Sequence, residues 1–162
     1  MTNTVEKADV KRDNKKLILD VISFISRFAM ALVWLVAGFT KLGERVAEAQ
    51  AIRAYDIFGA TWSNYLSYLI APLEIAGGVL LLFGIFLRHS SLVSTFVLVL
   101  FIIGIAQAWQ RGLVIDCGCF GPKDADPGVG MDYALTIARD VLFIFFSLWT
   151  YYRPFKKFAI YA

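Results

Sequence analysis

The chain has 162 residues, of which 59% are hydrophobic and 18% are charged, and its mean hydropathy of +0.65 excludes an ordinary water-soluble globular protein. A net charge of +3 gives no support for nucleic-acid binding, and two cysteines with one histidine cannot build a disulfide framework or a zinc site. We therefore expect one domain embedded in membrane lipid, with no metal and no nucleic-acid partner.

Four apolar runs are long enough to cross a bilayer, whose hydrocarbon core of about 30 Å needs about 20 helical residues. They are predicted at residues 17–41, 66–87, 92–109 and 134–152. The predicted fold is an all-α, integral membrane four-helix bundle over residues 17–152. A polar tail (residues 1–16) precedes this bundle and a basic tail (residues 153–162) follows it.

The connections between these runs differ in length and character. Residues 43–65 alternate charged and apolar positions in an imperfect amphipathic pattern, which favours a helix lying at the membrane surface. Aromatic residues there suit the belt at a membrane surface: Tyr55, Trp62, Tyr65 and Tyr68. Only Arg88-His89-Ser90-Ser91 separates the second and third runs, so these two are predicted to form an antiparallel hairpin.

Flanking charges predict how the bundle is oriented. Four spans place both termini on one side, where nine Lys and Arg residues flank the spans, against five on the other side. The positive-inside rule then places both termini in the cytoplasm and the connection between helices 3 and 4 outside. Thiol pairs also become oxidised and stay oxidised on that outer side.

Both cysteines lie in that connection, within Asp116-Cys117-Gly118-Cys119-Phe120-Gly121-Pro122. A disulfide needs Cα atoms about 4.4–6.8 Å apart, and two cysteines one residue apart reach this range only if the chain bends, as Gly118 permits. A bridge over so short a span is expected to be strained, and strained bridges exchange readily. Reactivity also needs a thiolate, which Asp116 opposes and which Arg111, Lys123 or a nearby helix N-terminus would favour.

Four charged residues fall inside the predicted spans: Arg27, Glu74, Arg139 and Asp140. Such charges cost about 2.5–3.5 kcal/mol each to insert, so they normally face the bundle interior and pair. Counting residues along each helix places Glu74 between the two arginines in depth and within reach of either. Three roles stay open: a structural ion pair, a proton acceptor or polar anchor at Glu74 below the cysteines, or a quinone head-group site. Asp20 and Lys41, near the ends of the first helix, are expected to snorkel to the surface.

Glycines recur within or beside the predicted spans. Small residues let membrane helices approach closely, and this role is expected of Gly38, Gly77, Gly78, Gly84 and Gly104.

The Cys-Gly-Cys signature, preceded by Pro72-Leu73-Glu74-Ile75-Ala76-Gly77-Gly78, resembles the MauE branch of the DoxX-like membrane proteins. Arg27 followed by Ala37-Gly38-Phe39-Thr40-Lys41-Leu42 is similar to the DoxX-type first helix. The resemblance covers about residues 17–152. It implies a multi-pass protein of the bacterial plasma (inner) membrane that takes part in extracytoplasmic thiol–disulfide chemistry, often beside thioredoxin-like proteins.

Carried over by position, Cys117 and Cys119 match the family's redox pair, and Arg27, Lys41 and Glu74 match its recurrent polar positions. MauE itself is associated with maturing the disulfide-rich small subunit of methylamine dehydrogenase, but no residue here points to methylamine. DsbB and vitamin K epoxide reductase use two cysteine pairs, whereas this chain has one pair and cannot run their internal relay.

Three hypotheses follow from these features. In the first, Cys117 and Cys119 exchange disulfides with a thioredoxin-like or other cysteine-containing partner outside the membrane. In the second, the protein is a non-enzymatic accessory or assembly subunit of a larger membrane complex, such as a respiratory one, and the bridge stiffens a docking loop. In the third, the two thiols form part of a metal or cofactor site that a partner completes.

Overall fold

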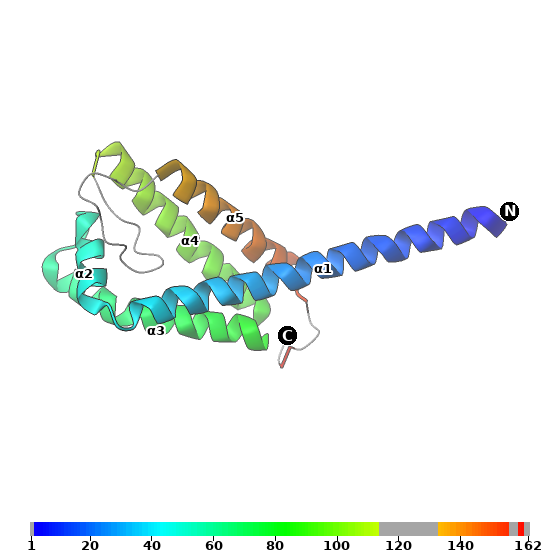
Figure 1. Cartoon of the computed structure of the whole chain (residues 1–162), viewed down its shortest axis with the longest axis horizontal. Helices are drawn as coiled ribbons and strands as arrows, with labels where there is room; N and C mark the ends of the chain where they lie inside the picture. The colour runs from blue at the N-terminus through cyan, green and yellow to red at the C-terminus, as the bar shows by residue number, and fades with distance from the viewer. Residues whose placement is uncertain (1, 114–132, 156–158, 161–162) are drawn as a thin grey trace.

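The computed structural model describes residues 2–113, 133–155 and 159–160, with side chains from Asp13 onward. It contains five helices (Figure 1), which are α1 (Thr2–Lys41), α2 (Arg45–Ala54), α3 (Ala60–Phe83), α4 (Leu87–Gln110) and α5 (Tyr133–Tyr152). No β-strand occurs in these described ranges. Four helices are long and apolar enough to cross a membrane: α1 from Asp13 onward, α3, α4 and α5. The all-α, four-span prediction is confirmed.

Burial in these helices is reversed relative to a water-soluble protein. The buried positions of α3 recur every three or four residues, as one face of a helix does, and they are mostly small or polar: Ser63, Ser67, Ala71, Glu74, Gly78 and Leu81. Large apolar residues point outward instead, among them Leu69, Leu73, Phe96, Leu100 and Phe145. A surface of this kind is stable against lipid and not against water.

Two glycines allow α1 and α3 to pack closely. A Cβ atom added at Gly38 would lie 2.6 Å from Ile75 Cγ1 and 2.9 Å from the Ala71 carbonyl oxygen, and one added at Gly78 would lie 2.7 Å from Leu35 Cγ. Real Cβ atoms do not approach so closely, so both positions require glycine for this packing. The prediction of close helix approach is confirmed at Gly38 and Gly78.

The other three glycines behave differently. An added Cβ at Gly77 would meet no atom within 4 Å in the described part of the chain, and one at Gly104 would make ordinary contact with Tyr55 at 3.8 Å. Gly84 ends α3 in the left-handed conformation, with a φ of 69°. It therefore serves chain reversal, although Arg27 and Ala159 also lie close to it.

The α3–α4 connection differs from the prediction. Residues Arg88-His89-Ser90-Ser91 were expected to form the turn, but α3 ends at Phe83 and α4 begins at Leu87, so that the turn is Gly84-Ile85-Phe86. Polar residues at a membrane surface fit the first turn of a helix as well as they fit a loop, whereas the left-handed Gly84 stops α3. The two helices still run in opposite directions, but they diverge from this turn, and α3 packs mainly on α1 whereas α4 packs mainly on α5 (Figure 1).

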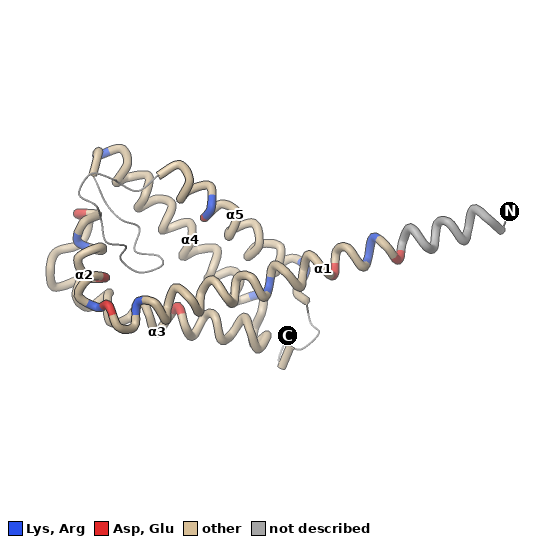
Figure 2. Tube along the Cα trace, in the orientation of Figure 1, with Lys and Arg blue, Asp and Glu red and all other residues tan. Residues whose placement is uncertain are grey.

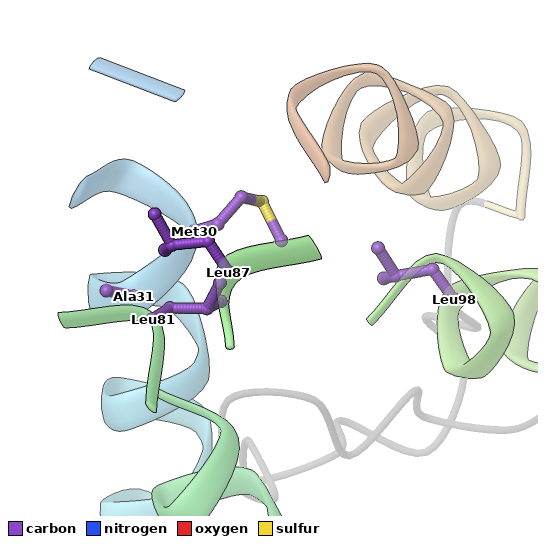
Figure 3. Packing of buried hydrophobic residues seen from close by; sticks show 5 residues of the cluster. All are labelled: Met30, Ala31, Leu81, Leu87 and Leu98. Carbon is purple, nitrogen blue, oxygen red and sulfur yellow. The ribbon is translucent and has the colours of Figure 1, made fainter. Parts of the chain in front are cut away.

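The apolar core is small and lies where α1 passes the α3–α4 turn. Figure 3 shows Met30 and Ala31 of α1 against Leu81 and Leu87, with Leu98 farther along α4. These side chains are at most 7% exposed. The core therefore fixes one end of the bundle by apolar packing.

Hydrogen bonds between side chains join the helices nearer the middle. Trp34 Nε1 donates to Ser94 Oγ at 2.8 Å, and Ser94 Oγ lies 3.1 Å from Ser147 Oγ, which connects α1, α4 and α5. Trp149 Nε1 donates to Ser23 Oγ at 3.1 Å. Such bonds hold membrane helices together at about 1 kcal/mol or less each.

The bundle has two distinct ends (Figure 1). The end of α4, the start of α5 and the surface helix α2 lie at one, here called the α2 end. The α3–α4 turn and the end of α5 lie at the other, the turn end, beyond which the first half of α1 projects. At the turn end, half-exposed Asp20 accepts from Arg153 Nη2 at 3.3 Å. Figure 2 shows charged residues gathered around α2 and few along the middle of the helices.

Candidate functional site

Lys41, the last residue of α1, is buried at the α2 end of the bundle. It is 3% exposed, and its Nζ donates to Glu74 Oε1 at 2.6 Å and lies 3.7 Å from Glu48 Oε1. The prediction that Lys41 snorkels to the surface is wrong. The chain turns back after α1, so that α2 and α3 supply carboxylates that hold the ammonium inside.

An ion pair does join the helices at Glu74, but its cation is Lys41 and neither of the expected arginines. The depth of a residue along its helix does not show which face of that helix meets its neighbour. Gly38 packs against Ile75, the residue next to Glu74. This contact brings Lys41, one turn farther along α1, within reach of the carboxylate.

Arg139 and Asp140 form a second charged pair within α5. Arg139 Nη2 and Nε donate to Asp140 Oδ1 at 3.0 and 3.1 Å. Asp140 is 2% exposed, and the Arg139 guanidinium lies 5.8 Å from the centre of the Phe143 ring. A neighbouring cation thus compensates one oxygen of a carboxylate that the bundle buries almost completely.

The two pairs line one cavity of about 40 Å³ between α1, α3, α4 and α5, and its walls are Val33, Trp34, Ala37, Lys41, Glu74, Leu98, Phe101, Arg139, Asp140 and Phe143. Lys41 Nζ also lies 6.0 Å from the centre of the Phe101 ring. Four of the six charged residues singled out within the spans or at their ends therefore meet at one place.

Two carboxylate oxygens of this cluster are unsatisfied. Glu74 Oε2 and Asp140 Oδ2 are buried and accept no hydrogen bond from any residue that the structure describes. A buried acceptor without a donor costs about 1–3 kcal/mol, and a charged one costs more. Each such atom in a native fold calls for an explanation, such as a water, an ion or a functional role.

Arg27 lies apart from this cluster, at the turn end. Its guanidinium donates to the carbonyl oxygens of Leu81 at 2.9 Å, Leu82 at 2.8 Å and Phe155 at 2.8 Å. The last carbonyls of a helix have no partner within the helix and carry partial negative charge. Arg27 therefore caps α3 and ties it to the chain after α5.

Glu48 belongs to the cluster and was not singled out from the sequence. It lies on α2, outside the candidate spans, and is 6% exposed. Burial raises the pKa of its carboxyl, and the charge of Lys41 offsets part of this rise. The available signal was weak, because the imperfect amphipathic pattern does not show which face of α2 turns inward.

Cys117 and Cys119 lie outside the described residues, but the structure describes the chain on both sides of them, up to Leu113 and from Tyr133 onward. Trp109, near the end of α4, stacks on Tyr133 at the start of α5, with ring centres 5.9 Å apart and planes 4° apart. The Tyr133 hydroxyl donates to the Leu113 carbonyl. Nearby, Arg111 pairs with Asp56 at 2.5 Å. The chain thus leaves α4 and enters α5 at adjoining points of the α2 end.

The chain matches a known protein family over most of its length. A family model described as Methylamine utilisation protein MauE matches residues 19–153, which include all four candidate spans apart from the first residues of α1. No curated protein and no solved structure matches the chain. The link to DoxX-type proteins stays a prediction.

Proposed function

Since this chain belongs to the MauE family and is a multi-pass membrane protein by its four apolar helices, we propose that it supports thiol–disulfide exchange outside the bacterial plasma membrane. Cys117 and Cys119 are the exchanging pair. The proposed partner is a thioredoxin-like or other cysteine-containing protein on that side.

The observation that carries this proposal is the pairing of the two chain ends that border the cysteine connection. The Trp109–Tyr133 stack and the Tyr133–Leu113 hydrogen bond hold these ends together at the α2 end. A connection anchored at adjoining points on a rigid bundle supports exchange, because the bundle fixes where a partner must dock. The family match also extends across the cysteine positions.

The exchange proceeds through a mixed disulfide. The thiolate of one cysteine attacks a partner disulfide, forming a new S–S bond, and the partner's S–S bond breaks to release one partner thiolate, which takes up a proton. The second cysteine, as a thiolate, then attacks its neighbour's sulfur. This step closes the Cys117–Cys119 bridge and releases the second partner thiolate. The partner gains two electrons and this chain loses two.

The surroundings of the pair bear on which protonation state it holds. Arg111, one of two cations expected to favour a thiolate, is engaged with Asp56. Its positive field is therefore partly neutralised, which weakens its expected effect on the thiols.

Repeated turnover also needs an electron donor or acceptor, for which a membrane quinone or a further protein is proposed. The exchange steps do not require the quinone to bind in the cavity between α1, α3, α4 and α5.

The test compares exchange with assembly in Cys117→Ser, Cys119→Ser and the double variant. We expect the double variant to lose partner oxidation or reduction while its membrane level and complexes stay normal. One single variant should accumulate a mixed disulfide that reducing agent releases, and this adduct names the partner. Normal exchange with lost assembly would instead establish the accessory-subunit function.

Orientation is tested separately in the cysteine-free double variant. Thr61→Cys places a thiol on an exposed residue in the first turn of α3, at the α2 end, and His89→Cys places one at the turn end. A membrane-impermeant maleimide applied to intact cells should label Thr61→Cys and not His89→Cys. The reverse pattern would put the cysteine connection in the cytosol and refute the proposed function.

A further inference from the structure

The charged cluster at the α2 end does not balance its own charge. Among the residues that the structure describes, two cations, Lys41 and Arg139, face three carboxylates, Glu48, Glu74 and Asp140. Leu98 and Phe101, the cavity residues from α4, add no charge. The fully ionised cluster would carry one excess negative charge, and in low dielectric surroundings such a charge is strongly unfavourable.

The unsatisfied atoms show where this excess lies. Glu74 Oε2 and Asp140 Oδ2 have no donor within the described ranges, and the side chains that carry them are only 7% and 3% exposed. Their other oxygens already accept from Lys41 and Arg139. Within the described part of the chain, the cluster therefore lacks a hydrogen-bond donor for these oxygens and about one positive charge, and both residues line the same cavity.

The size of the cavity and its ligands limit what can supply that charge. A volume of about 40 Å³ is room for about three waters, at 10–15 Å³ each, and is far below the size of an aromatic ring. Within residues 2–113, 133–155 and 159–160, no group of three His, Cys, Asp or Glu side chains could hold a metal ion. A proton accompanied by water meets both requirements.

We infer that this cavity is an intramembrane proton-binding site, in which Glu74 and Asp140 together hold one exchangeable proton hydrated by cavity water. Lys41 and Arg139 limit the site to one proton, because their two positive charges compensate two of the three carboxylates. This inference does not rest on the proposed thiol exchange, since it involves neither cysteine.

Infrared difference spectroscopy of the full chain in lipid nanodiscs tests the site, because a protonated carboxyl group has a C=O stretching band that a carboxylate lacks. At neutral pH the wild type should show a band equivalent to one carboxyl group, shifted in heavy water. Glu74→Gln and Asp140→Asn each remove one negative charge and keep the side-chain shape, so either should abolish the band. Lys41→Met should double it.

The matched control is Asp56→Asn, which alters an exposed carboxylate at the same end of the bundle and should leave the band unchanged. The inference is overturned if the wild type shows no such band, or if the band survives either substitution. It is also overturned if sodium in place of choline removes the band at constant pH, because the site would then bind a metal cation. The wild-type measurement alone decides the matter if a variant does not fold.

Discussion

The two buried cations of α1, Arg27 and Lys41, have chemically different partners. At the turn end, Arg27 donates to three backbone carbonyls, which present fixed partial charges at a helix end. At the α2 end, Lys41 pairs with the ionisable groups Glu74 and Glu48. Carbonyls cannot take up a proton, whereas carboxylates can.

This difference separates a structural charge from a functional one. Arg27 fixes the relative position of α3 and the chain after α5, and it leaves those carbonyls satisfied. The Lys41 cluster retains unsatisfied oxygens and an excess negative charge among the described residues. Membrane proteins keep such costly arrangements where protons or ligands are handled, so altering the two ends should have distinguishable consequences.

Lys41→Met should have the largest effect on stability. Removing one partner of a buried ion pair typically costs about 3–5 kcal/mol, here because the carboxylate that loses Lys41 must either stay charged in the interior or take up a proton. Unfolding in detergent micelles, followed by tryptophan fluorescence, measures the change. Lys16→Met, at an exposed position of the same helix, should be nearly neutral. Adding Glu74→Gln to Lys41→Met should recover part of the loss, and no recovery would argue against the pair.

Arg27→Leu should have the second-largest effect and lower the free energy of unfolding by about 3 kcal/mol or more. Hydrogen bonds to charged groups contribute about 1.5–3 kcal/mol each, and their contributions do not add fully. The same unfolding measurement applies. Arg88→Leu, at an exposed position of the same end, is the control and should change stability by at most about 0.5 kcal/mol. The protonated-carboxyl band should be intact in Arg27→Leu; its disappearance would mean that the two ends are coupled.

Gly38→Ala should cost about 1–3 kcal/mol, because the added methyl group meets the Ala71 carbonyl oxygen and the Ile75 backbone nitrogen, each at 2.9 Å. It should also disturb the Lys41–Glu74 pair and leave the Arg27 cap intact. Gly77→Ala is the matched control, since its methyl group meets no described atom within 4 Å. Better helix propensity should make this control stabilising by up to about 1 kcal/mol. Equal losses in both variants would refute close packing at Gly38.

The smallest expected effect is the contribution of Glu48 to the pH dependence of stability. The pKa of Glu48 is raised above the ordinary value of 4.5, mainly by burial. The folded state therefore binds the proton more tightly than the unfolded state, so the contribution of Glu48 to the free energy of unfolding is largest at low pH and is lost as pH rises from 4.5 through the raised pKa. One proton gives a slope of at most about 1.4 kcal/mol per pH unit. Glu48→Gln should remove this contribution, and an unchanged profile would refute it.

Hydropathy and length, which are properties of local segments, determined the four spans, a short helix within residues 43–65 and the opposite directions of α3 and α4. The cysteine signature and the preceding Pro72–Gly78 segment likewise sufficed to suggest the MauE family, which the family match shows. Orientation across the membrane and the reactivity of Cys117 and Cys119 stay predictions. None of these inferences requires knowing which helix faces meet.

Only the tertiary structure decided which charges meet. Depth along the helices favoured an arginine for Glu74, whereas the close approach at Gly38 brings Lys41 to it, and α2 folds Glu48 over the same ammonium. The left-handed Gly84 likewise placed the α3–α4 turn before the polar residues that resembled a loop. Helix register and facing arise from contacts between residues far apart in the chain, so a pattern read along one segment cannot supply them.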